Sequence, residues 1–323
     1  MEKIKKRISN NGLLLVAILM FVLTGLLNKS FLTSFNINAL LTEISFMGFL
    51  RMGMTFVLLT GGTDLSVGAV AGLSTVIIAM TMKHLELGNP TLTVLVGIVL
   101  AIVVCTALGI GNGLLVTYLK LPPLIVTLGM SWVAMGLGQM LLKGAPLALS
   151  IKSFRTLMTA KLLNVIPVSF LITVAALAFL SYVLRALRFG REFYAVGSNK
   201  YAAFISGTNT NAVLIKAYAI CGGFAGIAGL LIAAYTGSGY PAAANNYETY
   251  TIAAVVMGGT SMNGGEGKIA QTLIGVAILR LLNKLVVFSG LSSISGYIEG
   301  IIIGTILIIV LLINTSKEGE QAK

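Results

Sequence analysis

Long, uninterrupted apolar runs alternate with short polar or glycine-rich segments over nearly the whole chain. Most runs have close to the ~20 residues that an α-helix needs to cross a bilayer. The pattern predicts ten spans, at residues 12–30, 41–60, 66–83, 91–118, 123–142, 165–187, 211–235, 249–260, 269–288 and 294–314. The run at 249–260 is too short to cross without flanking turns. The run at 66–83 directly follows a glycine-rich turn, so a broken or half-buried helix is expected there.

The apolar runs are continuous, as in ILIIVLLI at 306–313, whereas the strands of a membrane β-barrel alternate apolar and polar residues. Helices satisfy their own backbone hydrogen bonds in lipid. Only 10% of the 323 residues are charged, against about a quarter in ordinary soluble proteins, so the lipid bilayer is the expected solvent. The sequence therefore predicts an all-α polytopic membrane protein with about ten transmembrane helices, forming one domain over residues 1–323.

The net charge of +12 comes from basic residues that flank the spans. With ten crossings, twelve Lys and Arg fall on the side of the N-terminus and six on the other side, so the positive-inside rule places both termini in the cytoplasm. No basic and aromatic face is present that could bind a nucleic acid. The start MEKIKKR has the charge order of a signal peptide, but no small-residue cleavage site follows the apolar run, so a retained first helix is expected.

Small residues recur at four-residue spacing within three of the predicted spans: Cys105, Gly109 and Gly113, then Gly222 and Gly226, then Gly300 and Gly304. This spacing puts them on one face of a helix, where they let a second helix backbone approach closely. Tight helix packing is therefore expected, but the pattern is general to helical bundles and names no substrate.

Asp64 is the only aspartate in the chain and lies in the turn GGTDLS between two apolar runs. A charge at the bilayer centre costs about 2.5–3.5 kcal/mol on insertion scales, so this carboxylate should lie near an interface, be paired or face water. The topology above places the turn at the cytoplasmic side, where Asp64 can cap the next helix through the N–H groups of Ser66 and Val67. The functional alternative is a wall of an inner gate. Arg51 and Glu299 also fall within spans and are expected to pair with each other or to face a cavity.

The segment GGEGK at 264–268 is only superficially similar to a phosphate-binding loop. That motif needs a Gly five residues before the Gly-Lys pair and a hydroxyl residue after it, and Met262 and Ile269 stand in those places. The sequence contains no nucleophile-elbow motif, no metal-ligand cluster and no close carboxylate pair within one span. We therefore expect no enzymatic activity, no resident cofactor and no metal site.

A short internal similarity links GGTDLSVG at 61–68 with GGTSMNGG at 258–265. Transporters are often built from repeats whose interrupted helices lie on the transport path. Gly-Gly-Thr can also recur by chance in a chain with 37 glycines. Both interpretations remain open at this point.

The segment 188–210, FGREFYAVGSNKYAAFISGTN in its central part, lies between spans on the predicted cytoplasmic side. Ser198 is a suitable N-cap and Gly207 a suitable helix stop, which predicts a helix of about two turns between them. Tyr201, Phe204 and Ile205 would share one of its faces. So short a helix is marginal alone in water and needs something to pack against, either its own bundle or a cytoplasmic partner.

Four stretches of the chain together resemble the membrane permease subunits of bacterial ABC importers for ribose, galactose, xylose and autoinducer-2. They are LLTGGTDLSVGAVAGL at 58–73, GIGNGLLVTYLKLPPLIVTLGM at 109–130, FYAVGSNKYAAFISGTN at 193–209 and YETYTIAAVVMGGTSMNGGEGKIAQTLIGVAIL at 247–279. Two positions depart from the family pattern. Thr63 stands where members commonly have Ile, and Tyr250 stands where they often have an acidic residue, which puts in doubt a carboxylate role at that place.

The resemblance implies a permease bundle in the bacterial inner membrane that imports a monosaccharide or a sugar-like signal. Its implied partners are a separate ATP-binding subunit at the cytoplasmic face, an extracytoplasmic solute-binding protein at the outer loops near 143–164 and 236–250, and a second permease chain, identical or related. In the family, the stretch at 193–209 is the coupling helix, which inserts into a groove on the ATP-hydrolysing subunit. The residues implied in that coupling are Gly197, Ser198, Asn199, Tyr201, Ala202, Ala203, Phe204, Ser206 and Gly207.

The transport path or gate is assigned to polar and aromatic residues in or beside the spans: Asp64, Ser66, Asn112, Tyr247, Glu248 and Glu299. The alternative function is an ion-coupled secondary transporter in which Asp64 or Glu299 binds a proton or sodium ion at a broken helix. The two hypotheses differ in the energy source, which is ATP hydrolysis by a partner in the first and an ion gradient in the second.

Overall fold

The computed structural model describes residues 2–85, 87–290, 297–298, 300–301 and 304–305. The elements in chain order are α1 (Glu2–Leu27), η1 (Lys29–Leu32), α2 (Ser34–Leu59), α3 (Val67–His84), α4 (Pro90–Tyr118), α5 (Pro123–Leu142), β1 (Leu147–Ala148), α6 (Lys152–Met158), β2 (Lys161–Leu162), β3 (Ile166–Pro167), α7 (Val168–Ala186), α8 (Arg188–Ser198), α9 (Lys200–Ile205), α10 (Thr210–Thr236), β4 (Ser238–Gly239), α11 (Tyr247–Met257) and α12 (Ile269–Phe288).

Within the described residues, seven helices are long and apolar enough to cross a membrane: α2, α3, α4, α5, α7, α10 and α12. A shorter apolar helix, Gly12–Leu27, corresponds to the first predicted span. The predicted span at 249–260 is α11, which has only 11 residues. The predicted span at 294–314 lies mostly outside the described residues. The mostly helical, multi-span architecture is confirmed, and the count of ten is not.

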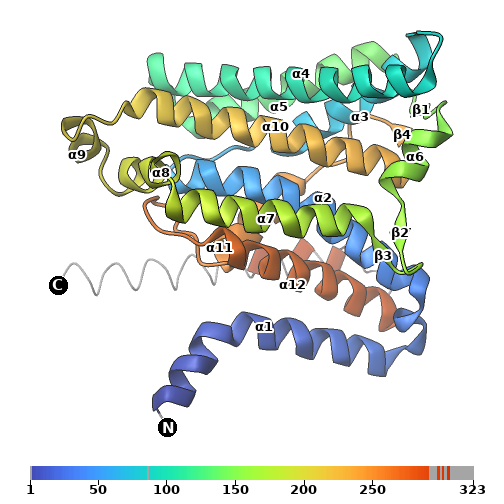
Figure 1. The fold of residues 1–323 in the computed structure, drawn as a ribbon, viewed down its shortest axis with the longest axis horizontal. Helices are drawn as coiled ribbons and strands as arrows, with labels where there is room; N and C mark the ends of the chain where they lie inside the picture. The colour runs from blue at the N-terminus through green and yellow to red at the C-terminus, as the bar shows by residue number, and fades with distance from the viewer. Residues whose placement is uncertain (1, 86, 291–296, 299, 302–303, 306–323) are drawn as a thin grey trace.

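The long helices lie side by side with their axes roughly parallel (Figure 1). The connections α8 and α9 lie at one end of this bundle, called the α9 end below, and α6 with strands β1 to β4 lies at the other, the α6 end. Helices α2, α3 and α10 contribute most of the buried core.

A Cβ on Gly109 of α4 would overlap the Tyr218 carbonyl of α10, and one on Gly222 would overlap the Cys105 carbonyl. The predicted close packing is confirmed at Gly109 and Gly222, whereas a Cβ on Gly300 or Gly304 would meet nothing within 4 Å among the described residues.

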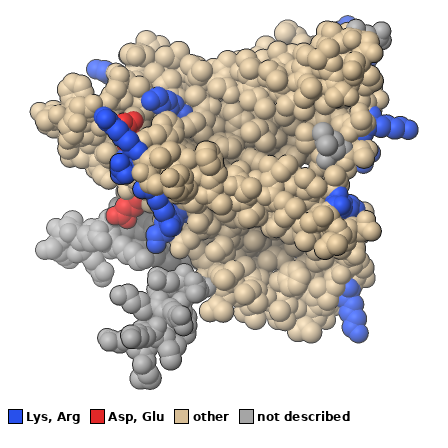
Figure 2. Space-filling model, viewed as in Figure 1, with Lys and Arg blue, Asp and Glu red and all other residues tan. Residues whose placement is uncertain are grey.

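Charged side chains on the visible face of the molecule gather toward the two ends, and the broad band between them is free of them (Figure 2). Large exposed side chains on α4, α5 and α7 are apolar, for example Val103, Ile125 and Phe179. This distribution fits a bundle whose axis crosses the bilayer, with its apolar sides in hydrocarbon.

Four two-residue strands qualify the all-α prediction. They form two small antiparallel sheets, β1 with β4 and β2 with β3. In the first sheet Leu147 pairs with Gly239, which joins the long connection after α5 to the segment that follows α10. The two loops predicted near 143–164 and 236–250 therefore meet at the α6 end.

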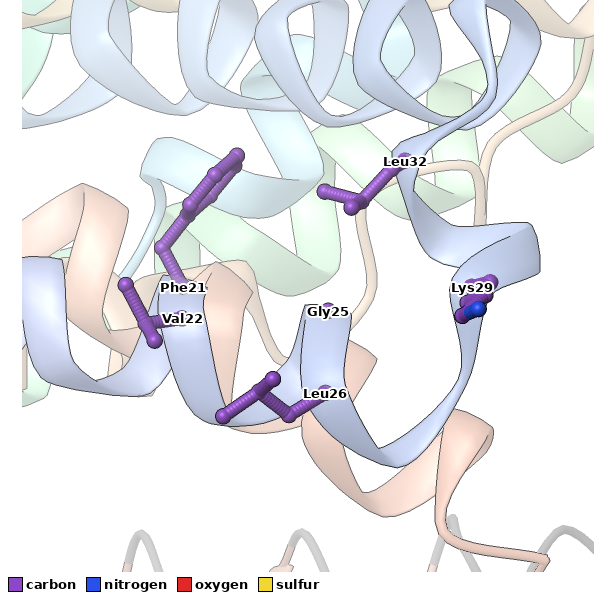
Figure 3. A pocket seen from close by; sticks show the side chains of 6 residues that line it. All are labelled: Phe21, Val22, Gly25, Leu26, Lys29 and Leu32. Atoms are coloured by element: carbon purple, nitrogen blue, oxygen red, sulfur yellow. The ribbon is translucent and has the colours of Figure 1, made fainter.

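Helix α1 lies along the outer edge of the bundle (Figure 1). Between α1 and η1 is an apolar hollow of about 430 Å³ (Figure 3). Its lining is Phe21, Val22, Gly25, Leu26, Lys29 and Leu32. The hollow has no convergent polar groups of the kind that fix a specific ligand.

Two connections run back into the bundle instead of staying at its ends. One is residues 60–66, between α2 and α3, and the other is residues 240–246, between β4 and α11. The second follows the small-residue face of α3: the Tyr240 N–H donates to the Thr75 hydroxyl at 3.0 Å, and a Cβ on Gly72 would overlap the Pro241 carbonyl. Both α3 and α11 therefore begin inside the bundle, and the predicted break before the span at 66–83 is confirmed.

We predict that Gly72→Ala lowers the thermal stability of the purified protein in detergent, because the new methyl group meets backbone that has no room to move. Overpacking of this kind costs about 1–3 kcal/mol. The matched control is Gly129→Ala in α5, where a Cβ meets nothing within 4 Å. There the substitution should be neutral or slightly stabilising, because Ala favours helix over Gly. Equal melting temperatures for the two variants by circular dichroism would contradict the tight packing of residue 241 on α3.

Candidate functional site

Helix α8 is fixed to the bundle by an aromatic and glycine face. The Phe193 ring is fully buried and packs edge-on against Phe56 of α2, with centroids 5.1 Å apart. Phe189 packs edge-on against Phe193 at the same centroid distance. A Cβ on Gly190 would overlap the Leu184 backbone, so glycine permits the sharp turn from α7 into α8. Helix α8 is therefore packed directly against α2 and α7.

The C-terminal end of α8 contacts the backbone of two other segments, the end of α2 and the loop before α12. A Cβ on Gly197 would overlap both the Leu59 carbonyl oxygen, at the end of α2, and the Gly265 nitrogen. The Gly265 N–H itself donates to the Leu59 carbonyl at 2.9 Å. Gly264 and Gly265 have φ of +87° and +74°, conformations that L side chains rarely adopt. We call Leu59, Gly61, Gly197, Gly264 and Gly265 the glycine junction.

The two Gly-Gly-Thr segments come together at this junction. A Cβ on Gly61 would lie 3.2 Å from the Asn263 carbonyl oxygen, and one on Gly264 would lie 2.7 Å from the Gly61 nitrogen. The two segments that share the internal similarity, 61–68 and 258–265, are therefore in contact with each other. The segment GGEGK at 264–268, whose similarity to a phosphate loop is superficial, packs against α8.

Tyr194 of α8 adds a side-chain link to the same loop. Its hydroxyl donates to the Gly267 carbonyl at 3.0 Å. Burial raises the pKa of the Tyr194 hydroxyl above its ordinary value, with the nearby Arg185 charge opposing the rise. The hydroxyl therefore keeps its proton at physiological pH and is able to donate this hydrogen bond.

Helix α9 projects from the bundle at the α9 end (Figure 1). The prediction that Ser198 caps it is wrong: Ser198 is the last residue of α8, and the Asn199 side chain accepts from the Ala202 N–H at 2.9 Å. The helix spans Lys200–Ile205, shorter than the predicted 198–207. Gly207, with φ of +81°, ends it as predicted, and its N–H donates to the Phe204 carbonyl at 3.0 Å.

The apolar face of α9 is exposed. Tyr201, Phe204 and Ile205 are 74%, 65% and 66% exposed, as their shared face predicts. Ala203 points the other way and is buried, so it anchors α9 instead of presenting a contact. Ala202 and Ser206 are exposed, and the Ser206 hydroxyl donates to the Ala202 carbonyl at 2.9 Å. A protruding helix with three large apolar side chains is suited to docking into a groove.

Asp64 is buried, and its carboxylate fixes the turn that leads into α3. One carboxylate oxygen accepts from the Ser66 N–H at 2.9 Å and from the Ser66 hydroxyl at 2.6 Å. The Asn112 amide of α4 donates to the same hydroxyl at 2.9 Å. The expected bond with the Ser66 N–H is present, but Ser66 is the N-cap residue of α3 and Asp64 lies two residues earlier. Asp64, Ser66 and Asn112 are at most 1% exposed, and their assignment to a gate stays a prediction.

The depth of this turn differs from the prediction. The Tyr218 hydroxyl of α10 donates to the Thr63 carbonyl at 3.3 Å. Tyr218 is the ninth residue of α10, about 12 Å along the helix from its first residue at the α9 end. The GGTDLS turn therefore enters the bundle and does not stay at the membrane surface. Its buried carboxylate is tolerated because hydrogen bonds surround it.

Glu248 and Tyr247 lie where α11 begins. The Glu248 carboxylate packs against the first turn of α3, since a Cβ on Gly68 would overlap it. The Tyr247 ring stacks on Phe46 of α2, with centroids 6.1 Å apart and planes 1° apart. Both side chains are partly exposed, in contrast to Asp64. Of the predicted path residues in the described part of the chain, these two retain access to solvent.

A largely buried charge cluster joins α2 to α12, and of its members only Arg51 was singled out from the sequence. Glu43 accepts from Lys284 at 2.7 Å and lies 3.9 Å from Arg280. Arg51, fully buried in α2, donates to the Tyr250 carbonyl at 3.0 Å. In the sequence, the signal for Glu43 was that it is an acidic residue within a predicted span. Glu299 lies outside the described residues, so its predicted pairing with Arg51 is not tested.

Within the described residues, no group of three or more His, Cys, Asp and Glu side chains could hold a metal ion. What the fold contains instead is a bundle of spans, two segments that re-enter it, and a short helix with an exposed apolar face outside it. This combination defines a multi-pass membrane transport protein.

Comparison with known proteins narrows this class. The chain belongs to the family described as the branched-chain amino acid transport system / permease component, whose model matches residues 36–311. It is 35% identical over 301 residues to a ribose import permease of Bacillus subtilis, covering 93% of this chain and 90% of that one. It is 32% identical over 308 residues to the ribose import permease of Escherichia coli K12, covering 94% and 93%.

A D-allose transport system permease of Escherichia coli K12 is 33% identical over 271 residues, covering 84% of this chain and 81% of that one. No solved structure matches the chain significantly. The predicted resemblance to sugar importer permeases is confirmed, and the ion-coupled alternative gains no support from these relatives.

Proposed function

We propose that this chain is the membrane-spanning subunit of an ABC importer for a monosaccharide, driven by a separate ATP-binding subunit. The relatives are permeases for ribose and allose, so a pentose or hexose is the expected solute. The observation that carries the proposal is α9, a short helix with an exposed apolar face at the end of the bundle. Its Asn199 cap and the buried Ala203 hold it in place while Tyr201, Phe204 and Ile205 project.

In this proposal the α9 end is cytoplasmic, as the excess of basic residues on that side favours. Residues 197–207 dock on the ATP-binding subunit, and closure of the ATPase pushes α9 and α8. The glycine junction passes that displacement to the end of α2 and to the loop before α12. The re-entrant turn at 60–66 follows α2 directly, so the gate assigned to Asp64 and its neighbours moves in the same step.

The α6 end is the proposed docking place for a solute-binding protein outside the membrane. The β1–β4 pairing supports this, because it joins the two predicted outer loops into one surface. A second permease chain, of the same or a related sequence, completes the path. The cytoplasmic location of both termini belongs to this proposal as well.

The test is purification of the tagged chain from its native membrane, followed by reconstitution into vesicles with ATP inside and a binding protein outside. We expect an associated ATPase, and ribose or allose uptake that requires ATP hydrolysis. Uptake driven by an ion gradient without nucleotide would overturn the proposal.

We predict that Asp64→Asn retains ATP-driven uptake within about threefold. The amide oxygen can still accept from the Ser66 N–H and hydroxyl, and loss of one charge-assisted hydrogen bond costs about 1 kcal/mol of stability. Asp64→Leu, which offers no acceptor, should reduce the amount of folded protein in the membrane. Uptake that disappears in the Asn variant at normal protein levels would instead indicate that the charge itself takes part in transport.

A further inference from the structure

Helices α3 and α11 meet start to start inside the bundle. The Glu248 carboxylate in the first turn of α11 lies against Gly68 in the first turn of α3, at a distance that leaves no room for a Cβ. From this point α3 runs to the α6 end, where the Met82 carbonyl accepts from Ser150. Helix α11 runs the other way, to the loop that holds Gly264 in the glycine junction. The two helices therefore run in opposite directions from one meeting point inside the bundle.

The meeting point lies midway along the bundle. The Tyr247 ring stacks on Phe46, which is the thirteenth of the 26 residues of α2. At 1.5 Å per residue, Phe46 is about 18–20 Å from either end of that helix. Since the hydrocarbon core is about 30 Å thick, the start of α11 lies near its centre.

At this depth the chain carries exposed polar groups and non-helical backbone. Asn245, Asn246 and Thr249 are exposed and Glu248 is partly exposed, and residues 241–246 form turns. Elsewhere at mid-depth the exposed face is apolar, as at Val103 of α4, which is 57% exposed. Lipid does not solvate irregular backbone, amides or a carboxylate, so such groups occur only against protein or a water-filled cavity.

We propose that residues 245–249 line the transport path and form a weak binding site for a neutral polyhydroxylated solute. This rests on the proposed function as an importer subunit. The Asn245 and Asn246 amides each offer donors and acceptors, the Thr249 hydroxyl offers both, and the Glu248 carboxylate accepts two hydroxyl hydrogens. Sugar hydroxyls are donors and acceptors together and match this set. Packing against Gly68 of α3 restricts the Glu248 carboxylate, so this part of the site is preorganised.

The site has polar groups without an exposed positive charge, which favours a neutral solute over an anion. Asn246 adopts φ of +66°, a left-handed conformation that Asn tolerates better than most residues. That conformation turns the chain from the re-entrant segment into α11 and places residues 245 and 248 at the same bend. The proposed site is therefore the whole exposed polar bend at mid-membrane depth.

The test uses single cysteines in the complete transporter with its ATPase, in membrane vesicles. Thr249→Cys and Asn245→Cys are treated with a charged, membrane-impermeant thiosulfonate, and Val103→Cys is the control at the same depth. The native Cys105 and Cys221 are 0% exposed, so the unmodified chain gives the background. We expect labelling at 245 and 249 at least about tenfold faster than at 103, because a thiol reacts as the thiolate, which needs water. Ribose or allose, whichever the transporter carries, should slow the labelling.

Binding is tested separately by Asn245→Leu and Asn245→Ser. The Leu variant should raise the KM for uptake about tenfold, the effect of one lost hydrogen-bonding group, and the Ser variant should restore part of the affinity. Labelling at 245 and 249 no faster than at 103 overturns the path assignment, and labelling without sugar protection or a KM change overturns the binding site. ATP-driven uptake by the unmodified complex in the same vesicles tests the proposed function independently of both.

Discussion

Phe204→Asp should abolish ATP-driven sugar uptake while the permease is made, inserted and folded normally. Phe204 is 65% exposed at the tip of α9 and makes no buried contact that its loss would remove from the core. In the proposed complex with the ATP-binding subunit, the same position enters an apolar groove. An unpaired carboxylate placed there costs about 2 kcal/mol or more in partner affinity, roughly a 30-fold loss.

The measurement is uptake in reconstituted vesicles, together with ATPase co-purification and the melting temperature of the permease. Phe204→Leu is the matched control, because it keeps an apolar side chain at the position and should retain most of the uptake. Normal uptake by Phe204→Asp would show that α9 is not the coupling contact. Ala203→Arg is also expected to lose uptake, but through unpacking of α9, since Ala203 is buried and faces the bundle.

The sequence pattern predicted the helices and the outer face of α9 because both depend on local periodicity. Spacing alone places Tyr201, Phe204 and Ile205 on one face. Because solvent surrounds so short a helix, that face is exposed. The cap was less determined. Ser198 and Asn199 are adjacent and both suit an N-cap, so packing of Gly197 against Leu59, which keeps residue 198 in α8, decided between them.

The re-entrant segments could not be placed from the sequence. Residues 240–246, YPAAANN, have the turn-forming composition of an outer loop, and composition carries no information on depth in the membrane. What draws this segment inward is the glycine and threonine face of α3, at Gly72 and Thr75, which contacts it over several residues. That contact joins positions about 165 residues apart, beyond the reach of any local pattern.

The same limit applies to GGTDLS. Its glycines and its aspartate predict a tight turn with a capped helix after it, and both are present in modified form. Whether that turn stops at the membrane surface or enters the bundle depends on Tyr218 and Asn112, which come from two other helices. Polar groups on neighbouring spans were the only available hint that a carboxylate could be hydrogen-bonded at depth.

Gly197→Ala should uncouple ATP hydrolysis from transport by a different route from Phe204→Asp, because it leaves the exposed face of α9 intact. Its Cβ would overlap the Leu59 carbonyl and the Gly265 nitrogen, so α8 must move away from the glycine junction. The cost in stability is about 1–3 kcal/mol. We expect the ATPase to co-purify as before and to hydrolyse ATP, while uptake per ATP falls about tenfold, as for an interaction of about 1.4 kcal/mol.

Ala195→Gly is the control for this variant, since Ala195 is an exposed residue of the same helix. It lowers the helix propensity of α8 by about 1 kcal/mol without touching the junction. A general weakening of α8 would make the two variants alike, whereas transmission through the junction makes only Gly197→Ala lose coupling. Equal uptake per ATP in both would place the route from α9 to the gate elsewhere, along the Phe193–Phe56 contact between α8 and α2.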